Sequence, residues 1–184
     1  MRVPRFVALL RGVNVGTAKR VPMADLRALL SGLGYTRVAT LLNSGNAVFD
    51  APTGRPAQHA VAIAAAIAGR LQVEVPVIVK SAREFAAIVG ANPIQADASE
   101  HSRLLVAFVQ DAKALSGLAP LASLVVPPEQ YAVGKGAAYL LCASGILEST
   151  VAHALLGKAG RSVTTTRNWA TVLKLQAMTT EGDD

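Results

Sequence analysis

Two short apolar runs, residues 6–10 and 104–109, constrain the fold of this chain more than any other feature. Each run is too short for a stable helix and suits a strand that is covered on both faces. The same pattern follows each run: a helix, two strands joined by a tight turn, a second helix, a further strand and a final helix. The repeated order predicts a duplicated architecture, although residue identity between the two halves is faint.

Local signals in the first half are consistent with this order. Pro22 suits the first turn of a helix, and Gly34 is a typical stop signal beyond its last turn. Between them, apolar residues recur at helical spacing on one stripe, at Leu26, Leu29, Leu30 and Leu33. Residues 38–42 and 47–49 then predict two strands, because a short link that contains glycine joins them as in a hairpin.

The other predicted elements complete two sheets. The expected helices are 57–72, 82–90 (capped by Ser81 with Glu84), 112–122, 149–156 and 168–179, and the expected strands are 75–79, 131–133, 138–142 and 162–165. Residues 6–80 and 104–166 are each predicted to form a four-stranded antiparallel sheet with strand order 4-1-3-2 and two crossing helices. The predicted subdomains are 1–91 and 92–184, with polar residues 92–102 as their connection and an acidic tail at 181–184.

Charge is distributed unevenly along the 184 residues, whose net charge is +6. Residues 1–83 hold 11 Lys and Arg against 3 Asp and Glu, whereas residues 84–184 hold 7 against 9. A basic half attracts phosphate, nucleic acid or an anionic surface. The alternative is that the arginines coat helices and maintain solubility.

Several classes of protein do not fit the sequence. The single cysteine, Cys142, precludes an internal disulfide, fits a reducing cytoplasm and lies in an apolar strand-like run typical of a packed thiol. No apolar stretch approaches the roughly 20 residues of a membrane helix, and Arg11 interrupts the first apolar run, which argues against a signal peptide. The histidines at 59, 101 and 153 lack metal-ligand spacing, so no metal site is predicted, and no cofactor is indicated.

Three motifs, taken in order, resemble the bacterial domain-of-unknown-function family 1697. They are residues 10–16 (LRGVNVG) with Pro22, Met23, Leu26 and the Ser44-Gly45-Asn46 turn; the Asn92-Pro93 dipeptide; and residues 165–169 (TTRNW) with Thr171, Val172, Lys174 and Leu175. The chain departs from the family pattern at Asn43, Ile94 and Ala170. The resemblance implies an α+β fold of two ferredoxin-like (βαββαβ) halves in tandem, with helices on one face of each antiparallel sheet. It implies no activity, and whether the protein is an enzyme stays open.

A candidate ligand site follows from the predicted topology. In a 4-1-3-2 sheet the end of the first strand meets the start of the third, which brings the loop after residue 10 toward the 43–46 turn. The cluster is rich in hydrogen-bond donors suited to a carboxylate or phosphate. The predicted ligand-binding residues are Arg11, Gly12, Asn14, Gly16, Ser44 and Asn46, and Lys19 and Arg20 add positive charge. No candidate general base is evident, which favours binding over catalysis. The alternative is a network in which Asn14 and Asn46 only cap loop backbone.

A second place suited to an anion lies near the last predicted helix. The threonines at 164–166 are predicted to cap that helix, with Arg167 and Asn168 near its start. The sequence also leaves two other functions open. A nucleic-acid-binding module would use the basic half, but its strands offer only Phe6, Phe49 and Phe108 for base stacking, so weak binding is the most we expect. An interaction or scaffold protein is the third possibility.

Overall fold

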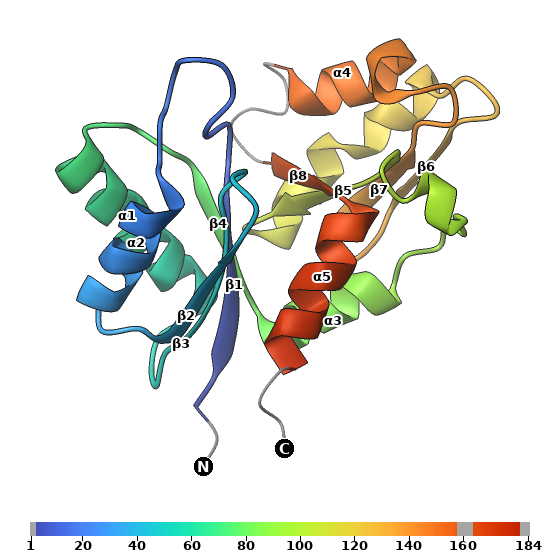
Figure 1. The fold of residues 1–184 in the computed structure, drawn as a ribbon. Coiled ribbons are helices and arrows are strands. Elements are labelled where there is room, and N and C mark those ends of the chain that lie inside the picture. Colours follow the sequence, from blue (N-terminus) through green and yellow to red (C-terminus); the bar gives the residue numbers. More distant parts are fainter. Residues whose placement is uncertain (1–2, 158–163, 181–184) are drawn as a thin grey trace. The chain divides into compact units, whose positions relative to one another are not determined.

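The computed structural model describes residues 3–157 and 164–180. It divides into two compact units, one formed by residues up to Phe85 together with those from Leu175 onward, and the other by Ala86 to Lys174. Figure 1 shows the elements of both units. The predicted acidic tail, and the start of the strand predicted at 162–165, lie outside the described residues.

The first unit contains a four-stranded antiparallel sheet covered by helices. Its elements are β1 (Arg5–Leu10), α1 (Met23–Gly32), β2 (Thr36–Leu41), β3 (Asn46–Asp50), α2 (Pro56–Leu71) and β4 (Val77–Ser81). The strand order β2-β3-β1-β4 is the predicted 4-1-3-2 order read from the other edge. The α+β sheet prediction is therefore confirmed for this half.

Burial explains why β1 is uninterrupted in its apolar character. Its residues from Phe6 to Leu10 are all buried, on both faces of the sheet. Alternate residues of β1 contribute to one core with the buried leucines of α1 and with Ile63 and Ile67 of α2. The predicted leucine stripe of α1 ends one turn early, because Leu33 lies at the C-cap and is 37 % exposed.

Helix α3 (Ala82–Gly90) follows β4 and shows the predicted capping box. Ser81 Oγ accepts the backbone N–H of Glu84 at 3.2 Å, and the Glu84 carboxylate accepts the backbone N–H of Ser81 at 2.8 Å. This reciprocal pair satisfies two amide groups that an uncapped helix would leave without partners. The helix begins where the sequence signal placed it, whereas β4 runs two residues past its predicted end.

The second unit repeats the sheet topology. Its strands are β5 (Leu104–Val109), β6 (Gln130–Val133), β7 (Ala137–Leu141) and β8 (Thr164–Asn168), in the order β6-β7-β5-β8, and all pairs are antiparallel. Its short helices are η1 (Ala98–Glu100), η2 (Ala112–Gly117), η3 (Ala119–Leu124), η4 (Ile146–Glu148) and α4 (Thr150–Leu156). Helix α5 (Trp169–Thr180) continues from β8 into residues that belong to the first unit.

Three predictions for this half need correction. The helix expected at 112–122 is two successive 3₁₀ helices, because Pro120 lacks the N–H that a continuous α-helix requires and Gly117 favours a break. The last strand, predicted to end at Thr165, continues to Asn168. The threonines at 164–166 belong to that strand and do not cap α5, since that role falls to Asn168.

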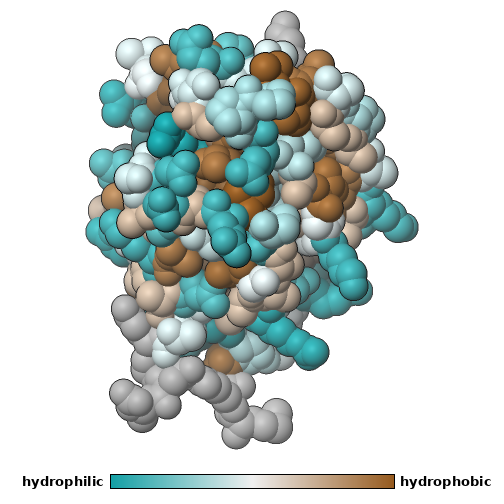
Figure 2. All heavy atoms as spheres, turned by 90° about the vertical axis from the view of Figure 1, so that its right-hand side faces the viewer, coloured by the Kyte–Doolittle hydropathy of each residue, from teal (hydrophilic) through white to brown (hydrophobic). Residues whose placement is uncertain are grey.

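Exposed apolar side chains are scattered over the surface. They include Val15 and Val61 in the first unit and Leu147 in the second, each more than 70 % exposed. Figure 2 shows apolar side chains in separate patches among hydrophilic ones on the face it displays. Single exposed apolar residues are ordinary on a folded protein. Among the described residues, no helix has both the length and the apolar character to cross a membrane.

A candidate anion-binding loop

The loop that leaves β1 lies against the turn that enters β3. Leu9 pairs with Asn46, and the backbone N–H of Leu10 donates to the carbonyl of Gly45 at 2.8 Å. On the other side of β1, the N–H of Arg11 donates to the carbonyl of Pro76 at 2.9 Å. Antiparallel pairing therefore brings residues some thirty positions apart to one end of the first sheet. We call residues 11–20 the β1 loop and residues 42–45 the β3 turn.

Asn14 joins the β1 loop to the β3 turn. Its Nδ2 donates to the carbonyls of Val21 at 2.8 Å and Asn43 at 2.7 Å, and its Oδ1 accepts the N–H of Val21 at 2.9 Å. The backbone at Asn14 is left-handed, with φ of 56°. Asparagine tolerates this conformation better than other residues with a side chain. One half-buried carboxamide therefore closes the loop at its own base and fixes it to the turn.

Asn46 and Ser44 form a second set of contacts inside the turn. The Asn46 side chain is fully buried, and its Nδ2 donates to the carbonyl of Leu41 and to Ser44 Oγ, both at 2.9 Å. These bonds stabilise the chain reversal between β2 and β3. The carboxamides of Asn14 and Asn46 thus engage the protein's own backbone, which matches the capping role that the sequence left open as an alternative.

Glycine is required at one position of the turn by close packing. Gly45 has φ of 82°, and a Cβ there would lie 2.6 Å from Leu10 Cβ and 2.8 Å from Val13 Cγ2. Gly12 and Gly16 differ, because their φ values of 65° and 63° are also left-handed but no heavy atom lies within 4 Å of the Cβ position. Gly45 therefore allows the β3 turn to contact β1. Gly12 and Gly16 leave open space above the backbone of the β1 loop.

The charges around the loop are positive. Arg11 is half-buried at the end of β1, whereas Lys19 and Arg20 are exposed. No carboxylate in the described part of the chain pairs with Lys19 or Arg20. Lys19 has φ of 52°, a left-handed conformation for which its position in the sequence gave no signal. The loop and turn themselves contain neither an acidic residue nor a histidine.

The other two predicted ligand residues belong to the second unit and have structural contacts there. Arg167 of β8 is only 8 % exposed, and its Nη1 donates to Thr165 Oγ1 at 2.8 Å and to the Thr166 carbonyl at 2.7 Å. Burial lowers the pKa of Arg167 to about 10. Asn168 Oδ1 accepts the N–H of Thr171 at 2.9 Å and so caps the start of α5.

The phenylalanines considered for base stacking are not available at the surface. Phe6 is 3 % exposed, and Phe49 and Phe108 are fully buried. In the first unit, Phe6 and Phe49 stack on each other with ring centroids 5.6 Å apart, and both contact His59. Base stacking requires an exposed ring face. Within residues 3–157 and 164–180, no three His, Cys, Asp or Glu side chains gather as metal ligands would.

Two sheets with one repeated topology define a class of α+β protein, the tandem ferredoxin-like fold. Within that class, a family model described as protein of unknown function (DUF1697) matches residues 3–139, and the chain belongs to this family. The match includes the β1 loop and the β3 turn but ends before the motif around Trp169. No curated protein matches the chain.

A solved structure of another bacterial protein shares the fold over nearly all of the chain. It is a conserved bacterial protein, SP0830 from Streptococcus pneumoniae, with a TM-score of 0.80 and 24 % identity over 97 % of this chain and 99 % of that chain. At this identity the likeness establishes the fold alone. Protein BT0572 from Bacteroides thetaiotaomicron covers 96 % of this chain and 88 % of its own at 8 % identity, but its TM-score of 0.22 does not indicate a common fold.

Proposed function

We propose that the protein binds a small anionic ligand, bearing a phosphate or carboxylate group, at the β1 loop. The observation that carries the proposal is the backbone of the loop, where every second residue is left-handed: Gly12, Asn14 and Gly16. Left-handed residues that alternate with ordinary ones turn neighbouring N–H groups toward a common centre, and such concavities are known to hold anions.

The side chains support the same ligand chemistry. Lys19 and Arg20 are exposed cations without a carboxylate partner among the described residues, and Arg11 lies at the base of the loop. A guanidinium and an ammonium group donate charge-assisted hydrogen bonds to phosphate or carboxylate oxygens. Asn14 and Asn46 contribute by holding the loop in shape, because their carboxamides are already bonded to backbone. They are therefore positioning residues in this proposal, and do not contact the ligand.

The same residues favour binding over catalysis. Proton transfer at the loop would need a group that titrates near neutral pH within hydrogen-bond reach of the ligand. Neither the β1 loop nor the β3 turn contains an acidic residue, a histidine or a cysteine. The donors present can orient and neutralise an anion, and the proposal assigns them no further step.

The test is an NMR titration of the ¹⁵N-labelled protein with inorganic phosphate and with acetate at constant ionic strength. We expect saturable shifts of the amide resonances of Gly12, Val13 and Gly16. The double variant Lys19→Asn/Arg20→Gln should bind at least about twofold more weakly, because each exposed charge contributes about 0.2–1 kcal/mol. Asparagine is chosen because the backbone at Lys19 is left-handed.

A matched control keeps the same change in net charge. Arg55 and Arg83 are exposed, and they follow the ends of β3 and β4, respectively. Because both of these strand ends pair with the start of β1, the two arginines lie at the opposite end of the sheet from the β1 loop. The variant Arg55→Gln/Arg83→Gln should bind phosphate as the wild type does. Equal weakening in both double variants would reduce the interaction to general charge attraction, and the absence of saturable shifts would refute the proposal.

A further inference from the structure

The second unit contains a pocket that belongs to no site described above. Its volume is about 240 Å³, somewhat below the roughly 300–1,000 Å³ typical of pockets for drug-sized ligands. Two chain segments form it, the link from η3 to β6 and the turn from β7 to α4. The lining residues are Leu124, Val126, Pro127, Glu129, Ser144, Gly145, Glu148, Ser149 and Thr150.

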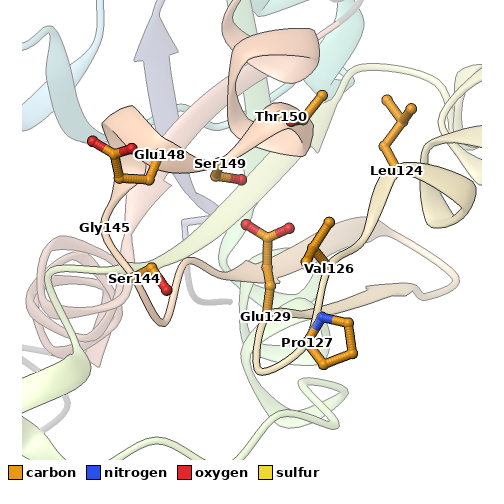
Figure 3. Close-up of a pocket in the computed structure, with 9 residues that line it drawn as sticks. All are labelled: Leu124, Val126, Pro127, Glu129, Ser144, Gly145, Glu148, Ser149 and Thr150. Carbon is orange, nitrogen blue, oxygen red and sulfur yellow. The ribbon is translucent and has the colours of Figure 1, made fainter.

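Glu129 is the central polar group of this pocket. Figure 3 shows its carboxylate pointing into the space between the two segments, toward Ser149, whereas Glu148 points outward at the rim. Glu129 is half-buried. No hydrogen bond or ion pair involves its carboxylate in the part of the chain that the structure describes. A carboxylate that is partly removed from water and has no protein partner favours a cation in the pocket.

The electrostatic balance of the pocket is negative. Its lining includes two carboxylates and no lysine, arginine or histidine. The start of α4 also lies at the pocket, but a helix end carries at most about half a positive charge and α4 has only seven residues. The carboxylates therefore outweigh it. The charge of Glu129 also acts on the buried thiol of Cys142. Burial chiefly raises the pKa of Cys142, a hydrogen bond with Ser149 lowers it, and the charge of Glu129 raises it.

From these features we infer that the pocket binds a small organic cation, with an ammonium group on Glu129 and an apolar part against Leu124, Val126 and Pro127. An ammonium group has three N–H donors and no acceptor. The carboxylate of Glu129 and the hydroxyls of Ser144 and Thr150 provide acceptors for them at the pocket wall. Leu124 and Val126 are 38 % and 68 % exposed, so their side chains are available to cover a short alkyl chain.

Three probes of similar size distinguish charge from apolar contact. The ¹⁵N-labelled protein is titrated separately with n-butylammonium, n-butanol and n-butyrate, at constant ionic strength. We expect saturable shifts for butylammonium at residues 124–129 and 144–150, and at least tenfold weaker binding of butanol and butyrate. Butylammonium shifts confined to other residues, or equal binding of butylammonium and butanol, would overturn the inference.

Two variants with the same change in charge locate the interaction. Glu129→Gln keeps the shape of the side chain and should weaken butylammonium binding at least about tenfold. Glu74→Gln removes an exposed carboxylate of the first unit and should leave binding unchanged. If Glu129→Gln does not fold, Glu148→Gln takes its place, with an expected loss of at least about twofold. Equal binding by wild type and the pocket variant would refute the role of the carboxylates. Because the proposed anion loop is tested with phosphate and acetate, the two proposals can fail separately.

Discussion

Replacement of Asn14 tests whether the β1 loop is held by one side chain. The Asn14 carboxamide makes three hydrogen bonds to backbone groups, at 2.7–2.9 Å. A net contribution of about 0.5–1.5 kcal/mol per bond gives roughly 1.5–4.5 kcal/mol in total. Asn14 is only half-buried, so water replaces part of what is lost and the lower half of this range applies. We expect Asn14→Gly to lower the free energy of unfolding by about 2 kcal/mol.

The left-handed backbone at residue 14 allows the contribution of the hydrogen bonds to stability to be separated from that of backbone conformation. Glycine accepts the left-handed φ of 56° without strain, whereas alanine incurs about 1–2 kcal/mol there. Asn14→Ala should therefore be less stable than Asn14→Gly by about 1 kcal/mol. Urea unfolding followed by circular dichroism measures both, provided that the m-value matches that of the wild type.

The control for this pair lies in the β3 turn. Asn43 accepts a hydrogen bond from Asn14 through its backbone carbonyl, whereas its own side chain is exposed. The free energy of unfolding of Asn43→Ala should therefore remain within about 0.5 kcal/mol of that of the wild type. The reasoning is refuted if Asn14→Gly is as stable as the wild type, because the three bonds then contribute nothing. If the alanine and glycine variants are equally stable, the argument from backbone conformation is wrong.

Three further predictions concern packing and burial inside each unit. Gly45→Ala should lower the free energy of unfolding by about 2 kcal/mol or more in the same urea assay, because the added Cβ would overlap a side chain of β1. Gly69→Ala serves as its control: this position lies in open space within α2, so the substitution should raise the free energy of unfolding by about 0.5–1 kcal/mol. Burial lowers the pKa of His59, so the unfolded chain takes up a proton first as the pH falls below the ordinary value of 6.5. Stability should decline from there at up to about 1.4 kcal/mol per pH unit, and less steeply in His59→Gln; identical pH profiles by calorimetry would contradict this. Tyr139→Phe should cost about 1–2 kcal/mol in urea unfolding, since the fully buried hydroxyl donates to the carbonyl of Ile88 at 2.6 Å.

The architecture could be predicted from the sequence because periodicity and turn signals agree over most of its length. The apolar runs that became β1 and β5 have no helical alternative at their length, and the hairpin links contain glycine. Once the order of elements was known, the handedness of the crossovers left one strand order. Predictions failed where local signals conflict. At 112–122 the repeated order of elements predicted one helix, but Gly117 and Pro120 divide this stretch into two 3₁₀ helices.

The candidate sites were less predictable, because they depend on whether a polar side chain forms its hydrogen bonds with the backbone or with a ligand. The proximity of the β1 loop and the β3 turn followed from topology. The sequence could not decide that Asn14 and Asn46 bond to backbone carbonyls, since a carboxamide serves a ligand equally well. The pocket around Glu129 gave no sequence signal, because it combines two segments separated by the hairpin of β6 and β7.

The assignment of helix α5 to both units has a consequence for synthesis on the ribosome. Residues from Leu175 onward belong to the unit that otherwise ends at Phe85, and the Arg5 guanidinium donates to the carbonyl of Met178 at 3.0 Å. At about 5–20 residues per second, roughly 5–20 s separate the emergence of these two segments. The amino-terminal sheet can form during that interval, but it lacks part of its unit. The first unit therefore remains incomplete until residues from Leu175 onward emerge. A premature stop codon before Leu175 would destabilise the unit that was synthesised first, because it would remove these residues.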